Sequence, residues 1–290
     1  MTRSARGGPS ASYDSEGDFG DVTEPRNPHP VLTQYYQHDD QRRSFVTALF
    51  DGSARYYDRL CGVMSLGSGQ WYRRWTLERT GLRPGMTLLD VATGTGLVAR
   101  AAVRILGDPR AVTGLDPSAG MLREARHTLS CPLVQGQVEE LPFRDARFDV
   151  LTIGYALRHA ADLEVAFREC LRVLKPGGRI LVLEISRPAS AGRRRLIRFY
   201  FMKVLPAIMA LTTRNRHATM LSRYYWDTIA TCVAPEVIMD SLRRSGFADV
   251  SRRVFGGFLS EYTASRPAAA EGGSATQRMA ISAGSTPRSP

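Results

Sequence analysis

The chain has 290 residues, a formal net charge of +11 and a hydrophobic fraction of 43%. That fraction is ordinary for a globular protein, and the length is enough for one sizeable α/β domain. No uninterrupted apolar run of about 18 residues occurs, so no transmembrane span is predicted, and the N-terminal sequence lacks the apolar stretch of a signal peptide. A basic surface suits nucleic acid, anionic lipid or acidic small molecules, and charge alone does not choose among them.

Cysteine usage and composition limit what the rest of the chain can be. The four cysteines (Cys61, Cys131, Cys170 and Cys232) form no Cys-x-x-Cys pair, so no metal site is predicted. A domain with a core of this size needs no disulfide framework, and free thiols in a reducing cytoplasm are expected. Residues 1–41 and 266–290 are rich in Gly, Ser and Pro, which predicts disordered tails on one folded domain over residues 42–265.

Hydrophobic spacing predicts two helices ahead of the core, over residues 44–64 and 70–80, with Asp51-Gly52 as a candidate interruption of the first. Five strands then alternate with helices: the strands are expected at 87–91, 111–115, 132–135, 148–154 and 179–184, and the helices at 97–106, 119–129 and 163–174. Ser118 is the expected N-cap of the second of these helices. Such alternation predicts a parallel sheet with right-handed crossovers, which is a doubly wound α/β fold.

After residue 186 the alternation stops. The sequence predicts a helical insert over about 189–226, a helix over 234–245 and two late strands, 247–254 and 257–265. These strands are expected to add a final antiparallel hairpin, which gives a mostly parallel sheet of seven strands.

The segment LLDVATGTG, residues 88–96, is the strongest candidate for a cofactor site. In an open α/β sheet the ligand binds beyond the carboxyl ends of the strands, and glycines let the backbone come close to it. Asp116 ends the second strand, where a carboxylate accepts hydrogen bonds from ribose hydroxyls and disfavours a 2′-phosphate. On the glycines alone NAD is an alternative, since Ala99 at the third position is tolerated by that fingerprint. The alternative for Asp116 is a turn or capping residue.

Four segments follow the order and spacing of class I S-adenosylmethionine-dependent methyltransferases: LLDVATGTG, GLDPSAGMLREAR, VEELPFRDARFDVLT and CLRVLKPGGRILVLE. Within that Rossmann-like superfamily the chain most resembles the ubiquinone/menaquinone biosynthesis C-methyltransferase family, over about residues 50–262. FDGSARYYDRL, ALRH, LVLEISRP, KVLP and the late SGF carry this closer resemblance. It implies S-adenosyl-L-methionine as the cofactor and a ring carbon of a demethylated prenyl quinol as the methyl acceptor.

The motifs and the resemblance together predict a set of cofactor-binding residues: Asp90, Ala92, Thr93, Gly94, Thr95, Gly96, Asp116, Pro117, Met121, Gln137, Val138 and Gly154. Some positions depart from the family's pattern. Gln137-Val138 stands where Asn-Ala or Asp-Ala is usual, Gly154 where a serine is common, and Leu97 where an aspartate commonly follows the turn. These departures affect the identity of the substrate more than the choice of cofactor.

Ring-carbon methylation requires a quinol hydroxyl to be deprotonated, or nearly so, and the ring proton to leave afterwards. Arg158 follows the fourth strand and is predicted to stabilise the developing phenolate or to organise a water molecule. His159 is the candidate base near neutral pH. The alternative for Arg158 is a solvated charge on a loop, and the alternative for His159 is a histidine that caps a helix or packs in the core.

A further group is predicted to contact the substrate: Tyr57, Tyr155, Arg158, Glu184 and Tyr224. Tyr57 and Tyr224 match tyrosines of the family, and core packing is the alternative for each tyrosine.

Residues 185–226 contain no Asp or Glu, and basic and apolar residues are mixed along them. Residues 193–216 are therefore predicted to meet an anionic membrane surface, which would place a cytoplasmic protein at the inner face of the membrane. The alternative is a lid over the substrate with a solvated basic face. No nucleic-acid-binding motif accompanies the charge, so no nucleic acid is predicted. A homo-oligomer is also expected.

Two other functions remain open on the sequence alone. The methyl acceptor can be another small molecule, such as a phospholipid amine or a secondary metabolite, because the cofactor half serves all of these reactions. The chain can also be a non-catalytic protein that binds S-adenosylmethionine.

Overall fold

The computed structural model describes residues 27–268. Its sheet has seven strands in the order β3-β2-β1-β4-β5-β7-β6. They are β1 (Leu88–Val91), β2 (Val112–Asp116), β3 (Leu133–Gln135), β4 (Phe148–Gly154), β5 (Leu174–Ile185), β6 (Ala248–Phe255) and β7 (Leu259–Ser265). The first five strands pair in parallel, whereas β7 is antiparallel to both β5 and β6. The predicted doubly wound sheet with its final antiparallel hairpin is therefore confirmed.

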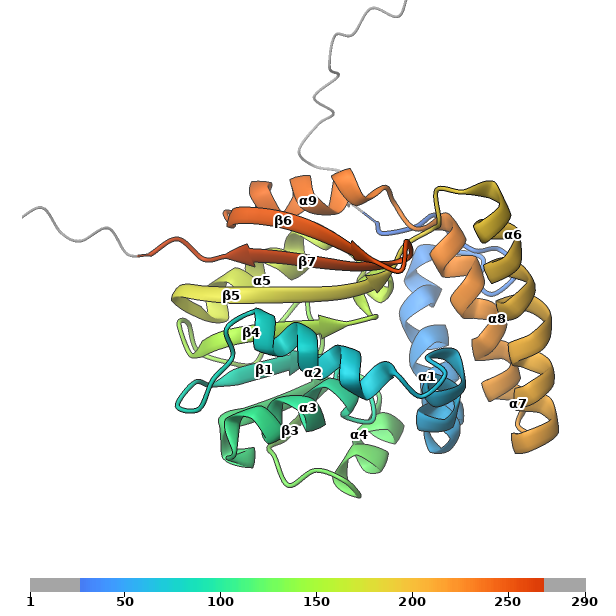
Figure 1. The fold of residues 1–290 in the computed structure, drawn as a ribbon, viewed down its shortest axis with the longest axis horizontal. Helices are drawn as coiled ribbons and strands as arrows, with labels where there is room; N and C mark the ends of the chain where they lie inside the picture. Colours follow the sequence, from blue (N-terminus) through green and yellow to red (C-terminus); the bar gives the residue numbers. More distant parts are fainter. Residues whose placement is uncertain (1–26, 269–290) are drawn as a thin grey trace, which may run out of the picture.

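Helices cover both faces of this sheet (Figure 1). One face packs against α2 (Gly69–Arg79) and α3 (Leu97–Leu106), and the other against α5 (Leu163–Val173) and α9 (Pro235–Arg244). Alternate residues of one strand serve the two faces: Val150 of β4 belongs to the first core, and Leu151 and Ile153 belong to the second. This explains why β4 is apolar almost throughout, since successive side chains point to opposite faces and both faces are covered.

The folded domain begins earlier than predicted. His29, Leu32 and Tyr36 are buried, and α1 (Asp39–Met64) starts before the expected residue 44. The prediction of disorder up to residue 41 is therefore wrong for residues 27–41. The rest of both predicted tails, residues 1–26 and 269–290, lies outside the described residues.

Asp51-Gly52 does not interrupt α1, which runs unbroken through both residues. The His217 side chain of α8 (Arg216–Thr231) lies close to this glycine: a Cβ at residue 52 would be 2.6 Å from its Cγ. The glycine therefore lies at a close approach of two helices and not at a turn.

The predicted insert is helical and longer than expected. It consists of α6 (Ala191–Phe199), a π-helical turn (Tyr200–Val204), α7 (Leu205–Thr213) and α8. With α1 these helices form a layer at the carboxyl end of the parallel strands (Figure 1). A separate core, which includes Leu49, Leu205 and Tyr225, joins α1 to the insert.

Candidate cofactor and substrate site

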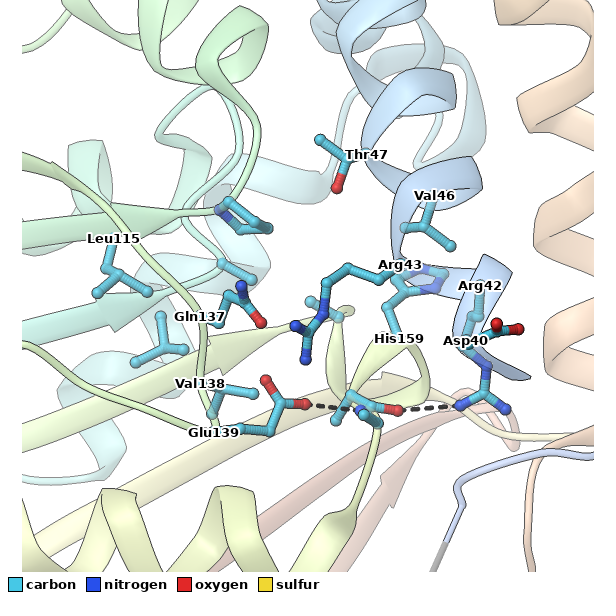
Figure 2. A pocket seen from close by; sticks show the side chains of 16 residues that line it. Asp40, Arg42, Arg43, Val46, Thr47, Leu115, Gln137, Val138, Glu139 and His159 are labelled. Carbon is cyan, nitrogen blue, oxygen red and sulfur yellow. Dashed lines mark hydrogen bonds between the residues drawn. The ribbon is translucent and has the colours of Figure 1, made fainter. Parts of the chain in front are cut away.

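The strand order reverses between β1 and β4, and a cavity of about 460 Å³ lies beyond the carboxyl ends of the strands there. Figure 2 shows its two walls. Gln137, Val138 and Glu139 come from the loop after β3, and Arg43 and Val46 of α1 face them. The cavity therefore lies between the sheet edge and the first helix.

A smaller cavity of about 70 Å³ continues from the first and shares lining residues with it, including Ala92, Pro117 and His159. Eight of the predicted cofactor residues line one cavity or the other: Ala92, Gly94, Asp116, Pro117, Met121, Gln137, Val138 and Gly154. The remaining four predicted residues line neither cavity: Asp90 belongs to β1, and Thr93, Thr95 and Gly96 belong to the turn that follows it.

Asp90 shapes the turn from beneath. Its two carboxylate oxygens accept hydrogen bonds from the hydroxyls of Thr93 and Thr152, each at 2.6 Å, and from the backbone N–H of Ala99 at 3.1 Å. Burial raises the pKa of Asp90 to about 6, although these hydrogen bonds oppose the shift. Because its acceptors are engaged by the protein, Asp90 joins β1 to β4 and α3 rather than contacting the cavity.

Asp116 lies at the carboxyl end of β2 and lines the smaller cavity. Its carboxylate accepts hydrogen bonds from the N–H groups of Gly94 at 2.7 Å and Ser118 at 2.8 Å. Burial raises the pKa of Asp116 to about 6, against the effect of the two hydrogen bonds. Each carboxylate oxygen has two lone pairs, so acceptor capacity remains for a ligand hydroxyl. The turn role and the ligand role of Asp116 are thus compatible.

The start of α4 (Ala119–Arg126) lies against the same cavity. Ser118 Oγ accepts a hydrogen bond from the N–H of Met121 at 3.0 Å, which confirms the predicted N-cap.

Gly96 has the left-handed backbone that the turn requires, with φ of 85°, and a Cβ there would lie 2.2 Å from Leu129 Cδ1. Gly107 at the other end of α3 also has a positive φ, 74°, but nothing lies within 4 Å of its Cβ position. Gly107→Ala is therefore expected to lose about 1–2 kcal/mol of stability, and Gly96→Ala more than that, because Leu129 must also move. Only Gly96→Ala should also weaken cofactor binding, which calorimetry measures. Equal affinities in the two variants would contradict this role for the turn.

Two acidic residues of α1, absent from the predicted set, tie that helix to the cofactor turns. Asp58 accepts hydrogen bonds from Thr95 Oγ1 and, at 2.7 Å, from Arg100. Asp51 accepts them from Ser118 Oγ at 2.5 Å and from the N–H of Gly120 at 2.8 Å. Residues seven apart lie on one face of a helix, so the spacing of these two acids was a usable signal.

The structure places Arg158 behind the cavity rather than in it. The guanidinium donates to Glu184 Oε2 at 2.6 Å and to Thr228 Oγ1 at 3.1 Å, and it lies 5.0 Å from the ring centroid of Tyr225. Arg158 is 1% exposed, so it is not the solvated loop charge of the alternative reading. Glu184, predicted to contact the substrate, is likewise buried outside both cavities.

Arg158 is linked to the cavity through two tyrosines. The Tyr225 hydroxyl donates to the Tyr57 hydroxyl at 2.9 Å, and Tyr57 lines the smaller cavity. Burial raises the pKa of Tyr57 well above its ordinary value. Arg158 is therefore connected to the cavity only through Tyr225 and Tyr57, without direct contact.

His159 lines both cavities, as predicted, but it is poorly suited to act as a base near neutral pH. Burial, and then the charge of Arg158, lower the pKa of its imidazole well below the usual value. The ring stacks on Tyr224, with the centroids 5.6 Å apart, and Phe50 meets its edge at 5.3 Å. The imidazole is therefore neutral and packed against aromatic rings.

The predicted substrate tyrosines divide into two groups. Tyr57 and Tyr155 line the smaller cavity. Tyr224 is fully buried, packs against Tyr35 and Phe45, and lines neither cavity, so the packing alternative describes it.

Sequence comparison places this site in a family. The chain matches the model of the ubiE/COQ5 methyltransferase family over residues 36–264. The chain belongs to the ubiE/COQ5 methyltransferase family. One relative, the ubiquinone/menaquinone biosynthesis C-methyltransferase UbiE of Shewanella woodyi, is 36% identical over 218 residues, which cover 73% of this chain and 86% of the relative. The Shewanella oneidensis protein of the same name is 38% identical over 183 residues, 61% and 73% of the two chains.

Solved structures share the fold of this methyltransferase. A SAM-dependent methyltransferase of Thermotoga maritima superposes with a TM-score of 0.53 at 19% identity, over 76% of this chain and 98% of that one. A protein of Methanococcus maripaludis gives 0.53 at 18% identity, over 75% and 94% of the two chains. Family and fold confirm the predicted enzyme class, a methyltransferase that uses S-adenosylmethionine.

The residues of the site fit this cofactor. Gln137 and Val138 line the larger cavity on the side where the adenine would lie, and Asp116 and Gly94 would hold the ribose and the amino-acid part. When bound, S-adenosylmethionine supplies a methyl group already activated on a sulfonium. At Gly154, which stands where a serine is common, a Cβ would lie 2.8 Å from Val98 Cγ2, so Val98 fills the space beside this glycine.

Proposed function

We propose that this methyltransferase methylates a ring carbon of a demethylated prenyl quinol of the menaquinone or ubiquinone type. The observation that carries the proposal is the aromatic lining of the smaller cavity, where Phe50, Tyr57 and Tyr155 stand beside Gly94 and Asp116. Such a lining suits a flat ring next to the cofactor. The names of the Shewanella relatives support the same substrate class.

The side chains around this cavity suit the chemistry of a quinol. Tyr57 stays protonated because burial raises its pKa, so its hydroxyl can donate a hydrogen bond to a quinol oxygen. The guanidinium of Arg158, on the far side of Tyr225, favours negative charge developing on that oxygen. We therefore propose Arg158 as a positioning residue that acts through Tyr225 and Tyr57, and His159 as a neutral part of the cavity wall.

Methyl transfer to a panel of acceptors tests this function. The full-length chain is incubated with labelled S-adenosylmethionine and with demethylated quinols, simple phenols and phospholipid amines. The highest kcat/KM is expected for a quinol, with the label on a ring carbon. Faster methylation of a phospholipid amine or of a hydroxyl group would establish the alternative function. Binding of the cofactor without any transfer across the panel would favour a non-catalytic protein.

The location, partners and assembly of the protein stay predictions. We expect a cytoplasmic protein at the inner face of the membrane, without nucleic-acid partners, that forms a homo-oligomer.

A further inference from the structure

Large exposed apolar side chains gather where three separate segments meet α6. They come from the loop after α1, the start of α2, α6 itself and the end of β6. We call these six residues the docking face: Leu66, Trp71, Leu196, Phe199, Val254 and Phe255. Each is between 43% and 87% exposed.

Contacts between these segments make the docking face continuous. Trp71 and Phe255 lie with ring centroids 6.5 Å apart. Arg193 at the start of α6 donates to the carbonyl of Gly256 at 3.4 Å, and Tyr200 just after α6 donates to the carbonyl of Val63 at 2.8 Å. α6 therefore reaches from the β6–β7 turn to the end of α1, with the start of α2 close to both.

The charged residues of α6 have one sign. α6 carries four exposed arginines: Arg193, Arg194, Arg195 and Arg198. Within residues 27–268 none of them forms an ion pair with a carboxylate. Exposed tryptophan, phenylalanine and leucine beside unpaired arginine are typical of a surface that enters the headgroup region of an anionic bilayer.

Other occupants fit less well. A second copy of the chain would bring two sets of unpaired arginines together, which is repulsive. Residues 191–213 form a helical segment long and apolar enough to cross a membrane, unlike the expectation from the sequence. However, Leu205 and Met209 within it are fully buried in the core shared with α1 and α8, so spanning would expose that core.

We propose that the docking face binds the surface of an anionic bilayer, with Trp71 and Phe255 inserted beside α6. This extends the predicted membrane segment, residues 193–216, to three further parts of the chain. The inference rests on the proposed function, since a prenyl quinol is held in lipid. The docking face lies at the carboxyl end of the sheet, as the cavities do, so binding would turn that end of the domain towards the membrane (Figure 1).

Vesicle flotation of the full-length chain tests the proposal, with phosphatidylcholine vesicles with and without phosphatidylglycerol. Binding is expected only to the anionic vesicles. Arg194→Gln/Arg195→Gln should weaken binding to the anionic vesicles about 30-fold. This factor corresponds to a loss of about 1 kcal/mol of binding free energy for each arginine. Arg104→Gln/Arg110→Gln is the control pair, because it removes the same charge from exposed residues in the last turn of α3 and in the short 3-10 turn before β2, outside the docking face. Equal loss in the two pairs would overturn the proposal.

Tryptophan fluorescence gives a second measurement. Brominated lipid in anionic vesicles should quench the wild-type chain. Trp71→Phe should clearly reduce the quenching, since Trp71 is 58% exposed and Trp226 only 5%. The part that remains is expected from Trp75, whose ring stacks on Trp71 at 5.6 Å. Quenching unchanged by Trp71→Phe, or self-association without vesicle binding, would overturn the docking face.

Turnover of a water-soluble short-chain quinol separates the two proposals. Turnover without vesicle binding refutes docking alone, and vesicle binding without turnover of any quinol refutes the proposed function alone.

Discussion

Arg158→Met is expected to lower the free energy of unfolding by about 3–5 kcal/mol, because it leaves a buried carboxylate on Glu184 without its partner. The same variant should reduce kcat/KM by at least about 100-fold if the guanidinium stabilises charge on the substrate oxygen. Cofactor affinity should change little, since Arg158 lines neither cavity. Denaturant unfolding, calorimetry with S-adenosylmethionine and quinol turnover measure the three quantities.

A double variant separates folding from reaction. Arg158→Met/Glu184→Gln removes both charges, so most of the lost stability should return, as replacing a whole buried ion pair is often neutral. Turnover should stay low, because the positive charge behind Tyr225 is still missing. Full turnover in the double variant would show that the ion pair serves the fold alone.

The sheet could be predicted because its signals are local. Each buried strand is a short apolar run between turn residues, and the turn at Gly94 and Gly96 fixes where the first strand ends. Asp116 follows from the same logic, since the end of the second strand must lie at the same sheet edge. Residues 27–41 could not be predicted in this way. Their polar composition hides Leu32 and Tyr36, whose burial depends on contacts with α1 and the insert.

The same limit applies to the site. Asp51 contacts Ser118 across 67 residues of sequence, and Arg158 contacts Glu184 across 26. Because Arg158 and His159 follow the fourth strand, the sequence correctly predicted that they lie near the carboxyl edge of the sheet. It did not predict which of the two faces the cavity. That choice depends on the packing of α8, whose Tyr225 separates Arg158 from the cavity.

Asp116→Asn is expected to weaken binding of S-adenosylmethionine about 10–100-fold, the range for losing a hydrogen bond to a charged group. The wild-type affinity should also depend on pH. Burial raises the pKa of Asp116 to about 6, and only the ionised carboxylate can accept hydrogen bonds from both ribose hydroxyls. Affinity should therefore fall as the pH is lowered through about 6, and this fall should be absent in the variant. Calorimetric titration between pH 5 and 8 measures both effects.

Stability of the ligand-free protein should move in the opposite direction. The folded-state pKa of Asp116 lies above its ordinary value of 3.8, so its contribution to stability is present at pH below 3.8 and is lost as the pH rises through about 6. Acid in that window should thus stabilise the free domain through this residue while weakening cofactor binding. Burial also raises the pKa of Asp90 to about 6, so Asp90 should contribute to stability in the same way. Its oxygens, however, accept hydrogen bonds from the protein and do not face the cofactor. A pH dependence of affinity that persists in Asp116→Asn would therefore assign the titration to Asp90 and the shape of the turn.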